Sequence, residues 1–269
     1  REFGETVVIL GVGLIGQLAV QIAKAAGCKV IAVDKTPERV EVAKGMGADV
    51  GLTVGKHDVT KEVFYHTNGI GADAVIICAA TPGSEPVNQA MKMCRGKGRI
   101  VVVGDVGMNL ERSPFYEKEL DFLISRSYGP GRYDPLYEEK GIDYPIEYVR
   151  WTEKRNMQAF LDLLKDRKVN VKSLVSAVFP IEEAEKAYEL LISGESEPLG
   201  LLLKYDFSKH YIPAGEAALP KRKIEVAPRV VEGKINVGLI GAGSFAKDVL
   251  LPLLSKLPEY NLKAIATTT

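Results

Sequence analysis

Residues 6–34 read TVVILGVGLIGQLAVQIAKAAGCKVIAVD, and this stretch decides the fold. Thr6–Leu10 is a short apolar run rich in β-branched residues, as in a strand buried on both faces of a parallel sheet. After a glycine turn, apolar residues recur at helical spacing until Gly27. Lys29–Val33 is a second apolar run, and it ends at Asp34. The order of strand, turn, helix and strand predicts a parallel βαβ unit.

The glycine turn predicts a binding site for a dinucleotide. Gly11, Gly13 and Gly16 form the pattern G-x-G-x-x-G, which permits a tight turn, close approach of the backbone to a pyrophosphate, and close packing of helix on strand. The helix start would hold the phosphates with its unpaired N–H groups and its dipole. Asp34 follows Gly16 by 18 residues, which is the spacing of an acid that binds the adenosine ribose. Because this acid would repel a 2′-phosphate, NAD is preferred over NADP.

The composition argues against several kinds of partner. Lys+Arg and Asp+Glu both number 35, so nothing favours binding to nucleic acid or to an anionic membrane. No apolar run reaches the roughly 20 residues of a membrane span, and no signal-peptide pattern is present. The three cysteines are isolated and odd in number, which favours a reducing, cytoplasmic location. The cysteines and the three histidines are scattered, so we expect this chain to bind no metal.

Further strands and helices alternate along the chain and predict a doubly wound parallel sheet of the α/β class. The expected strands are Val50–Val54, Ala74–Ala79, Arg99–Gly104 and Leu120–Ser125, and the expected helices are residues 37–46, Val59–His66 and Val87–Cys94. Ligands bind beyond the carboxyl ends of such strands. The glycine turn, Asp34, Ala79–Thr81 and Gly104–Asp105 should therefore lie along one rim.

Residues 113–150 differ in character, because six tyrosines are interleaved there with proline and acidic residues. Two interpretations stay open: a long loop that covers the sheet, or a wall of the substrate cleft. Beyond this segment we expect a helix capped by Thr152 and running to about Arg167, a helix over Ile181–Ile192 and a strand over Leu199–Tyr205.

The opening pattern returns near the end of the chain. Residues 235–254, INVGLIGAGSFAKDVLLPLL, again predict a strand, a glycine turn and a helix, with Ala246 in place of the third glycine. A strand over Leu262–Ala266 follows, with no acid after it. We expect one nucleotide per chain, at the first glycine turn. The chain starts without Met and stops on a strand pattern, which predicts an interior fragment of a longer protein.

These segments together resemble two known families. Residues 1 to about 206 resemble the cofactor-binding half of the medium-chain dehydrogenases, the alcohol, sorbitol and threonine dehydrogenase family. The matching pieces are GETVVILGVGLIGQLAVQIAKAAG, KVIAVDKTPERVEVAKGMGAD, GADAVIICAA, GKGRIVVVG and PIEEAEKAYELLISGE. Residues 235–269 resemble the start of the glucose–fructose oxidoreductase and inositol dehydrogenase (Gfo/Idh/MocA) family through VGLIGAGSFAKDVLLPLL. The whole resembles the bi-domain oxidoreductases of the medium-chain group.

This resemblance implies four parts. They are a dinucleotide-binding Rossmann domain (1–135), a return segment of a missing catalytic domain (136–206), a linker (207–234) and a truncated start of a second Rossmann domain (235–269). The cofactor-binding residues that it implies are Gly11, Gly13, Leu14, Ile15, Gly16, Asp34, Lys35, Arg39, Cys78, Ala79, Val103, Gly104, Asp105 and Ser127.

Among these residues, the resemblance places Ile15 against the nicotinamide, and Asp34 and Arg39 at the adenosine ribose. Cys78 and Ala79 would line the adenine side. The main chain of residues 103–105, with that around Ser127, would hold the carboxamide. The catalytic residues stay unknown, because the zinc ligands of the family lie mostly upstream of the cofactor domain. Zinc is therefore possible only in a full-length parent protein, and because some relatives dispense with zinc, its presence there stays open.

The predicted function is an NAD-dependent oxidoreductase that transfers hydride between an alcohol or sugar-type substrate and nicotinamide. The fragment alone is expected to be inactive. Two alternatives from other classes stay open: a module that binds and senses NAD without turnover, and an adenosylmethionine-dependent methyltransferase, whose glycine loop and acid can occupy similar places. Pairing of edge strands would give a homo-oligomer, by analogy with other folds of this type.

Overall fold

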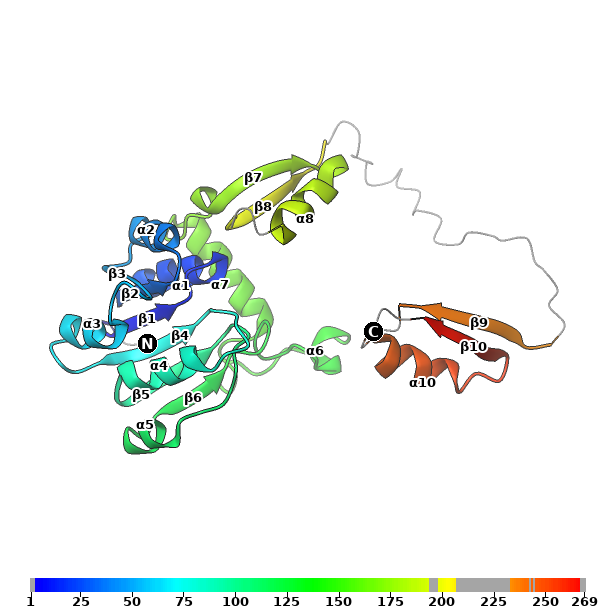
Figure 1. Ribbon diagram of the computed structural model, residues 1–269, viewed down its shortest axis with the longest axis horizontal. Helices are drawn as coiled ribbons and strands as arrows, with labels where there is room; N and C mark the ends of the chain where they lie inside the picture. The colour runs from blue at the N-terminus through cyan, green and yellow to red at the C-terminus, as the bar shows by residue number, and fades with distance from the viewer. Residues whose placement is uncertain (1–2, 194–197, 207–232, 242, 244, 267–269) are drawn as a thin grey trace. The chain divides into compact units, whose positions relative to one another are not determined.

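The computed structural model describes residues 3–193, 198–206, 233–241, 243 and 245–266, and it divides into two compact units, residues 1–207 and 208–269. The first unit contains a six-stranded parallel sheet in the order β3-β2-β1-β4-β5-β6 (Figure 1). Its strands are β1 (Thr6–Leu10), β2 (Lys29–Asp34), β3 (Val50–Thr53), β4 (Ala72–Ile77), β5 (Cys94–Val102) and β6 (Asp121–Ile124). The strand order reverses between β1 and β4, so the predicted doubly wound fold is confirmed.

Helices cover both faces of this sheet because alternate residues of each buried strand point to opposite sides. Val7 and Ile9 of β1 pack in one core with α1 (Leu14–Ala25) and α2 (Pro37–Gly45). Val8 and Leu10 pack in the other core with α3 (Val59–His66) and α4 (Glu85–Met93). All five residues of β1 are buried, as expected of a central strand.

The strands next to the candidate site end earlier than the sequence predicts. β4 ends at Ile77 and β5 ends at Val102, so Cys78, Ala79 and residues 103–105 are loop residues. At its other end β5 begins at Cys94, which pairs with Ala72 across an irregularity in the ladder. The shortened carboxyl ends leave the rim of the sheet open.

Apart from α5, the remaining elements of the first unit follow β6. These elements are α5 (Arg112–Glu117, before β6), α6 (Pro135–Glu138), α7 (Glu153–Lys165), η1 (Lys172–Leu174), β7 (Val175–Pro180), η2 (Ile181–Glu183), α8 (Ala184–Ile192) and β8 (Gly200–Lys204). β7, which the sequence analysis missed, pairs in parallel with β8. Thr152 is the N-cap residue of α7, as predicted, but its side chain makes no capping hydrogen bond. The hydroxyl is buried and has no hydrogen-bond partner among the described residues.

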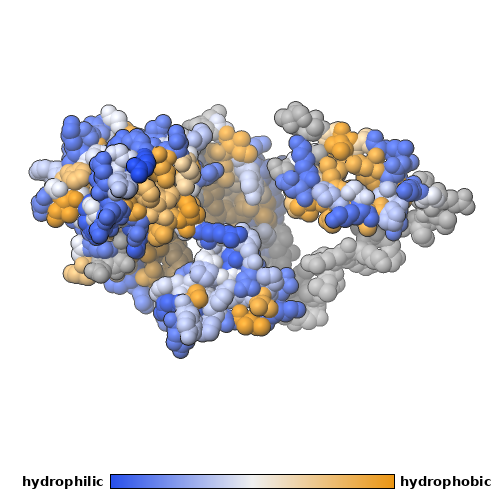
Figure 2. All heavy atoms as spheres, turned by 90° about the horizontal axis from the view of Figure 1, so that it is seen from below, coloured by the Kyte–Doolittle hydropathy of each residue, from blue (hydrophilic) through white to orange (hydrophobic). Residues whose placement is uncertain are grey.

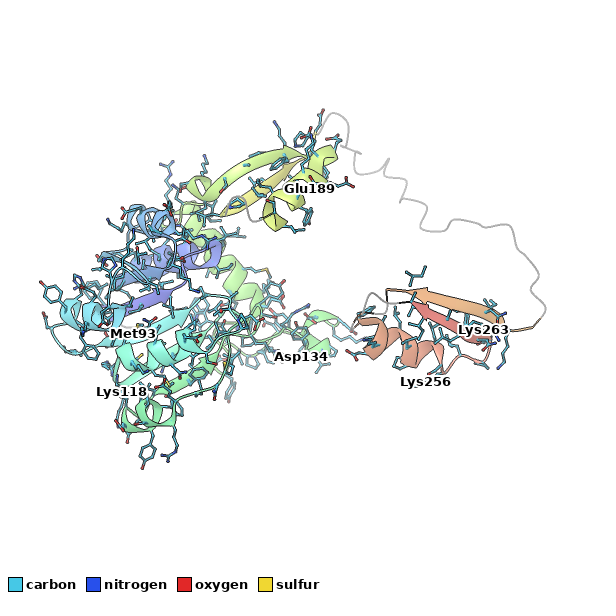
Figure 3. All side chains as sticks on the ribbon, viewed as in Figure 1. Met93, Lys118, Asp134, Glu189, Lys256 and Lys263 are labelled. Atoms are coloured by element: carbon cyan, nitrogen blue, oxygen red, sulfur yellow. The ribbon has the colours of Figure 1, made fainter. Side chains whose placement is uncertain are left out.

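The tyrosine-rich segment before α7 is held together by its own side chains. The hydroxyl of Tyr144 donates to Asp134, which Figure 3 labels at the start of α6, and the ring of Tyr144 stacks on Tyr137 with 5.7 Å between centroids. The Tyr137 hydroxyl accepts from the N–H of Lys154 at 3.0 Å. Arg155 donates to Asp143 at 2.8 Å. These contacts tie the segment to the start of α7, and both interpretations of its role stay predictions.

The second unit repeats the opening pattern. It contains β9 (Ile235–Ile240), a π-helical turn η3 (Ala246–Leu250), α10 (Leu251–Leu254) and β10 (Tyr260–Ala266), and its two strands are parallel. The N–H of Gly241 donates to Ala266 O at 2.8 Å, just as the N–H of Gly11 donates to Val33 O at 2.8 Å. Figure 2 shows hydrophobic residues gathered in the middle of the visible face of this unit, with hydrophilic residues around them.

Two predicted segments lie outside the described residues. They are nearly all of the linker (residues 207–232 of 207–234) and the last three residues of the chain. The boundaries of the four predicted parts therefore stay predictions.

Candidate functional site

A cavity of about 570 Å³ opens at the carboxyl ends of β1 to β4, where the strand order reverses. It is lined by Leu10, Gly11, Gly13, Val33, Asp34, Lys35, Arg39, Val54, Cys78, Ala79, Ala80, Thr81, Glu85, Pro86 and Gln89. Half of the residues predicted to bind the cofactor are among them: Gly11, Gly13, Asp34, Lys35, Arg39, Cys78 and Ala79. Open α/β sheets bind ligands at this place in the topology.

The glycine turn presents main-chain donors beside this cavity. Gly11 has φ +89°, and a Cβ there would lie 2.6 Å from the nitrogen of Ala79, so only glycine fits. The first helical hydrogen bond of α1 runs from the Gln17 N–H to Gly13 O at 2.9 Å. The N–H groups of residues 14–16 therefore lie outside the helical ladder, where an anion can accept from them.

Asp34 is held in place by the main chain at the end of β2. Its side chain is buried, and Oδ2 accepts from the N–H of Val12 at 2.7 Å while Oδ1 accepts from the N–H of Thr36 at 2.9 Å. A carboxylate has about four lone-pair sites, so two contacts leave capacity for two hydroxyl groups. Contact of this carboxylate with a ribose stays a prediction.

Charged groups of both signs surround this acid. Exposed Lys35 and half-buried Arg39 line the cavity, as does Glu85 at the start of α4. A Cβ on Gly13 would lie 3.9 Å from Nη1 of Arg39, so the guanidinium lies over the glycine turn. The cations offset part of the repulsion that Asp34 would exert on a phosphate.

Cys78 and Ala79 form an uncharged part of the cavity wall. The N–H groups of Cys78 and Ala79 both donate to Leu10 O, at 2.8 and 3.1 Å, which holds the loop after β4 against the glycine turn. Burial raises the pKa of the Cys78 thiol to about 11, so the thiol is protonated at neutral pH. A half-buried, uncharged side chain of this kind suits the flat face of an aromatic base.

The residues predicted to hold the carboxamide lie farther along the rim. The N–H groups of Val103 and Gly104 both donate to Ile77 O at 2.9 Å. Asp105 lines a separate, shallower cavity of about 560 Å³ with Thr81. Leu14, Ile15 and Gly16 do not line the first cavity either, and the side chain of Ile15 is 54% exposed.

Ser127 lies in the loop after β6 and does not reach the first cavity. It has φ 47°, an uncommon conformation for serine, and its Oγ lies 3.3 Å from the hydroxyl of Tyr133. The guanidinium groups of Arg126 and Arg132 each lie 4.5 Å from the centre of the Tyr133 ring. Hydrogen bonds from Ser127 and Arg132 lower the pKa of this tyrosine. The structure therefore links Ser127 to a cationic cluster that the sequence analysis did not single out.

The first turn of α4 was also missed. Glu85, Pro86 and Gln89 line the first cavity because α4 begins directly after the loop that follows β4. Ser84–Glu85–Pro86 is a typical helix start, and the same switch-point rule would have placed it at the rim. Contact of the cavity residues with a dinucleotide stays a prediction.

Two further properties concern metals and membranes. Within the described part of the chain, no three His, Cys, Asp or Glu side chains come together as a metal site. In that same part, every helix is too short or too polar to cross a lipid bilayer.

Comparisons with known proteins bear on the family. Residues 15–148 match the family model described as zinc-binding dehydrogenase. The chain is 31% identical to sorbitol dehydrogenase of Halalkalibacterium halodurans, over 72% of this chain and 50% of that protein. It is 30% identical to L-threonine 3-dehydrogenase of Bacillus licheniformis, over 71% of this chain and 49% of that protein. The chain thus spans about half the length of the curated relatives that it matches.

A solved structure shows the same architecture. Alcohol dehydrogenase TADH from Thermus sp. ATN1 superposes with a TM-score of 0.58 at 25% identity, over 76% of this chain and 52% of that chain. These matches support the resemblance of the first unit to medium-chain dehydrogenases. The resemblance of residues 235–269 to the Gfo/Idh/MocA family stays a prediction.

Proposed function

We propose that this chain carries the NAD-binding part of a medium-chain oxidoreductase. In the parent protein, hydride would pass between an alcohol or sugar-type substrate and the nicotinamide. The observation that carries this proposal is the contact between the Asp34 carboxylate and the N–H of Val12, because it joins the acid to the glycine turn at the edge of one cavity. Relatives named sorbitol and threonine dehydrogenase support hydride transfer with an alcohol.

The residues present fit a dinucleotide. A Cβ on Gly13 would meet no atom closer than 3.9 Å, so the turn has open space where a pyrophosphate would lie. The N–H groups of residues 14–16 would bind the phosphates, and Asp34 would bind the adenosine ribose. Cys78 and Ala79 would line the adenine, and the main chain of residues 103–105 would orient the carboxamide. When bound, NAD accepts or supplies the hydride, while these residues set its orientation.

Calorimetry of the chain with NADH and with S-adenosylmethionine tests the proposal. We expect NADH to bind and S-adenosylmethionine to give no heat, since a methyltransferase would show the reverse. Turnover of alcohols by a longer protein that contains this chain then separates a dehydrogenase from a module that only senses NAD. A chain that binds neither compound contradicts the proposal.

A further inference from the structure

The central peptide of the glycine turn is held from both sides by buried side chains. The N–H of Val12 donates to Asp34 Oδ2 at 2.7 Å, and its carbonyl oxygen accepts from Gln17 Nε2 at 2.9 Å. Val12 and Gln17 are both fully buried. A peptide with both groups bonded in this way cannot rotate without breaking one of the two contacts.

The second amide hydrogen of Gln17 extends the link to α2. Nε2 donates to the carbonyl oxygen of Arg39 at 2.8 Å, so both of its N–H donors are used. Arg39 lies in the first turn of α2, and its guanidinium lies over Gly13. Gln17 thus connects the glycine turn to Arg39, which lines the cavity.

The oxygen end of the Gln17 amide contrasts with its nitrogen end. Oε1 is buried and has no hydrogen-bond partner among the residues that the structure describes. Exchanging nitrogen and oxygen would place Oε1 against two carbonyl oxygens, so the amide orientation is settled by its partners. A hydrocarbon side chain would avoid this unpaired oxygen but would hold neither carbonyl.

We propose that Gln17 is a positioning residue of the cofactor site, which sets the place of Arg39 relative to the glycine turn. The inference rests on the proposed binding of NAD. Gln17 does not line the cavity and therefore acts through the Val12 peptide and Arg39.

Gln21 provides a matched control on the same helix. It lies one turn after Gln17 and is also buried, but its amide bonds to the main chain of Asn170, accepting from N at 2.6 Å and donating to O at 3.2 Å. Its Nε2 also makes a longer contact, of 3.5 Å, with the main-chain oxygen of Gln17, which does not involve the Gln17 amide. Neither Gln21 nor Asn170 lines the cofactor cavity. Replacing Gln21 therefore removes a buried amide from α1 without touching the glycine turn.

The test compares Gln17→Met and Gln21→Met by NADH fluorescence titration and thermal unfolding. We expect Gln17→Met to raise the dissociation constant of NADH about tenfold and Gln21→Met to change it less than about twofold, whatever each does to the unfolding temperature. Equal weakening in both variants, or parent-like binding by Gln17→Met, overturns the proposal. Failure of the parent chain to bind NADH would instead contradict the proposed function.

A double substitution distinguishes positioning of Arg39 by Gln17 from a general loss of structure around the glycine turn. If Gln17 acts through Arg39, Gln17→Met should weaken NADH binding much less in an Arg39→Met background, whereas additive effects overturn this route. Should Gln17→Met fail to fold, Gln17→Asn keeps an amide that is one methylene too short to reach both carbonyls. It is expected to weaken NADH binding as well, and parent-like binding by a folded Gln17→Asn overturns the proposal.

Discussion

A Cβ atom on Gly16 would lie 2.0 Å from the carbonyl oxygen of Gly11, so α1 packs on the glycine turn more closely than any side chain permits. Gly13 lies between these two residues and has open space instead. The glycines of one motif therefore differ: Gly16 permits close packing of α1 on the turn, whereas Gly13 leaves open space beside the turn.

Alanine at these two positions should separate stability from binding. Gly16→Ala forces a clash with backbone and should lower the free energy of unfolding by on the order of 2 kcal/mol. Gly13→Ala should unfold within about 2 °C of the parent yet bind NADH on the order of tenfold more weakly, because a methyl group would occupy the pyrophosphate position. Denaturation and NADH titration of both variants check this. Tight NADH binding by Gly13→Ala would contradict it.

Removing the acid should reduce the preference for NADH. Each ribose hydrogen bond to a charged acceptor contributes on the order of 1.5–3 kcal/mol, so Asp34→Ala should weaken NADH binding more than NADPH binding. Lys35 and Arg39 remain to attract a 2′-phosphate. Titration with both nucleotides gives the ratio, and Glu38→Ala, an exposed acid of α2 outside the cavity, is the control. An unchanged ratio in Asp34→Ala means that another residue discriminates.

Cys78 should be slow to alkylate at pH 8. Only the thiolate reacts, and a pKa of about 11 leaves on the order of a hundredfold less thiolate than in a free cysteine of pKa about 8.5. Because the folded pKa is raised, the rate should climb steadily as the pH rises toward 11. Mass spectrometry of iodoacetamide-treated protein measures each cysteine separately. NADH should protect Cys78 but not Cys28, which is buried outside the cavity.

One nucleotide should bind per chain, at the first glycine turn. The second turn repeats the main-chain contact of the first, but Ala266 is followed by Thr267 where Val33 is followed by Asp34. A phosphate at a helix start alone contributes modest affinity, and most of the binding of a dinucleotide comes from burying its rings. Calorimetry with NADH should fit one site that Gly13→Asp abolishes. Loss of binding in Gly243→Asp would show that the second turn is the site.

Lys118 should contribute more to the free energy of unfolding than an ordinary surface lysine does. Its ammonium group donates to three carbonyl oxygens at the end of α4: Met91 (3.0 Å), Lys92 (2.6 Å) and Cys94 (2.7 Å). Figure 3 labels Lys118 and the buried Met93 of this helix end. Lys118→Met should cost about 2 kcal/mol of unfolding free energy, because it leaves these carbonyls unpaired.

The control for Lys118 is Lys61→Met. Lys61 is exposed and its ammonium group pairs with Asp58 three residues away, so its loss should leave the free energy of unfolding nearly unchanged. Chemical denaturation of both variants gives the comparison, and equal costs would show that the three carbonyl contacts contribute little.

Local patterns predicted the sheet because each strand is a short apolar run bounded by glycine or polar residues. α3 was predicted with its observed bounds, Val59–His66. The apolar runs predict β4 and β5 too long at their carboxyl ends, because Cys78, Ala79 and Val103 continue the apolar pattern after the hydrogen-bonded ladder has ended. At these positions the apolar residues lie in loops at the rim of the sheet, and the sequence alone does not distinguish such loop residues from strand residues.

The features that were missed depend on partners distant in the chain. The six-residue run of β7, VSAVFP, is compatible with a strand, but its partner β8 lies beyond a helix. The bonds of Gln17 likewise depend on tertiary contacts, because the same side chain can face solvent, a helix end or another segment. By contrast, the cluster of Arg126, Ser127 and Tyr133 lies within one short loop and depends on the conformation of that loop. Lys35 and Arg39, which were predicted to bind the cofactor, line the cavity.

The central place of β1 in the sheet has a consequence for synthesis on the ribosome. Asp34 reaches Val12 across 22 residues, whereas Thr6 at the start of β1 bonds to Asp73 across 67. The acid and the glycine turn can therefore meet while β4 is still unmade, and short-range contacts of this kind form first. A nascent chain that stops before Ala72 carries Asp34 and the glycine turn and lacks the wall of the cavity formed by Cys78 and Ala79.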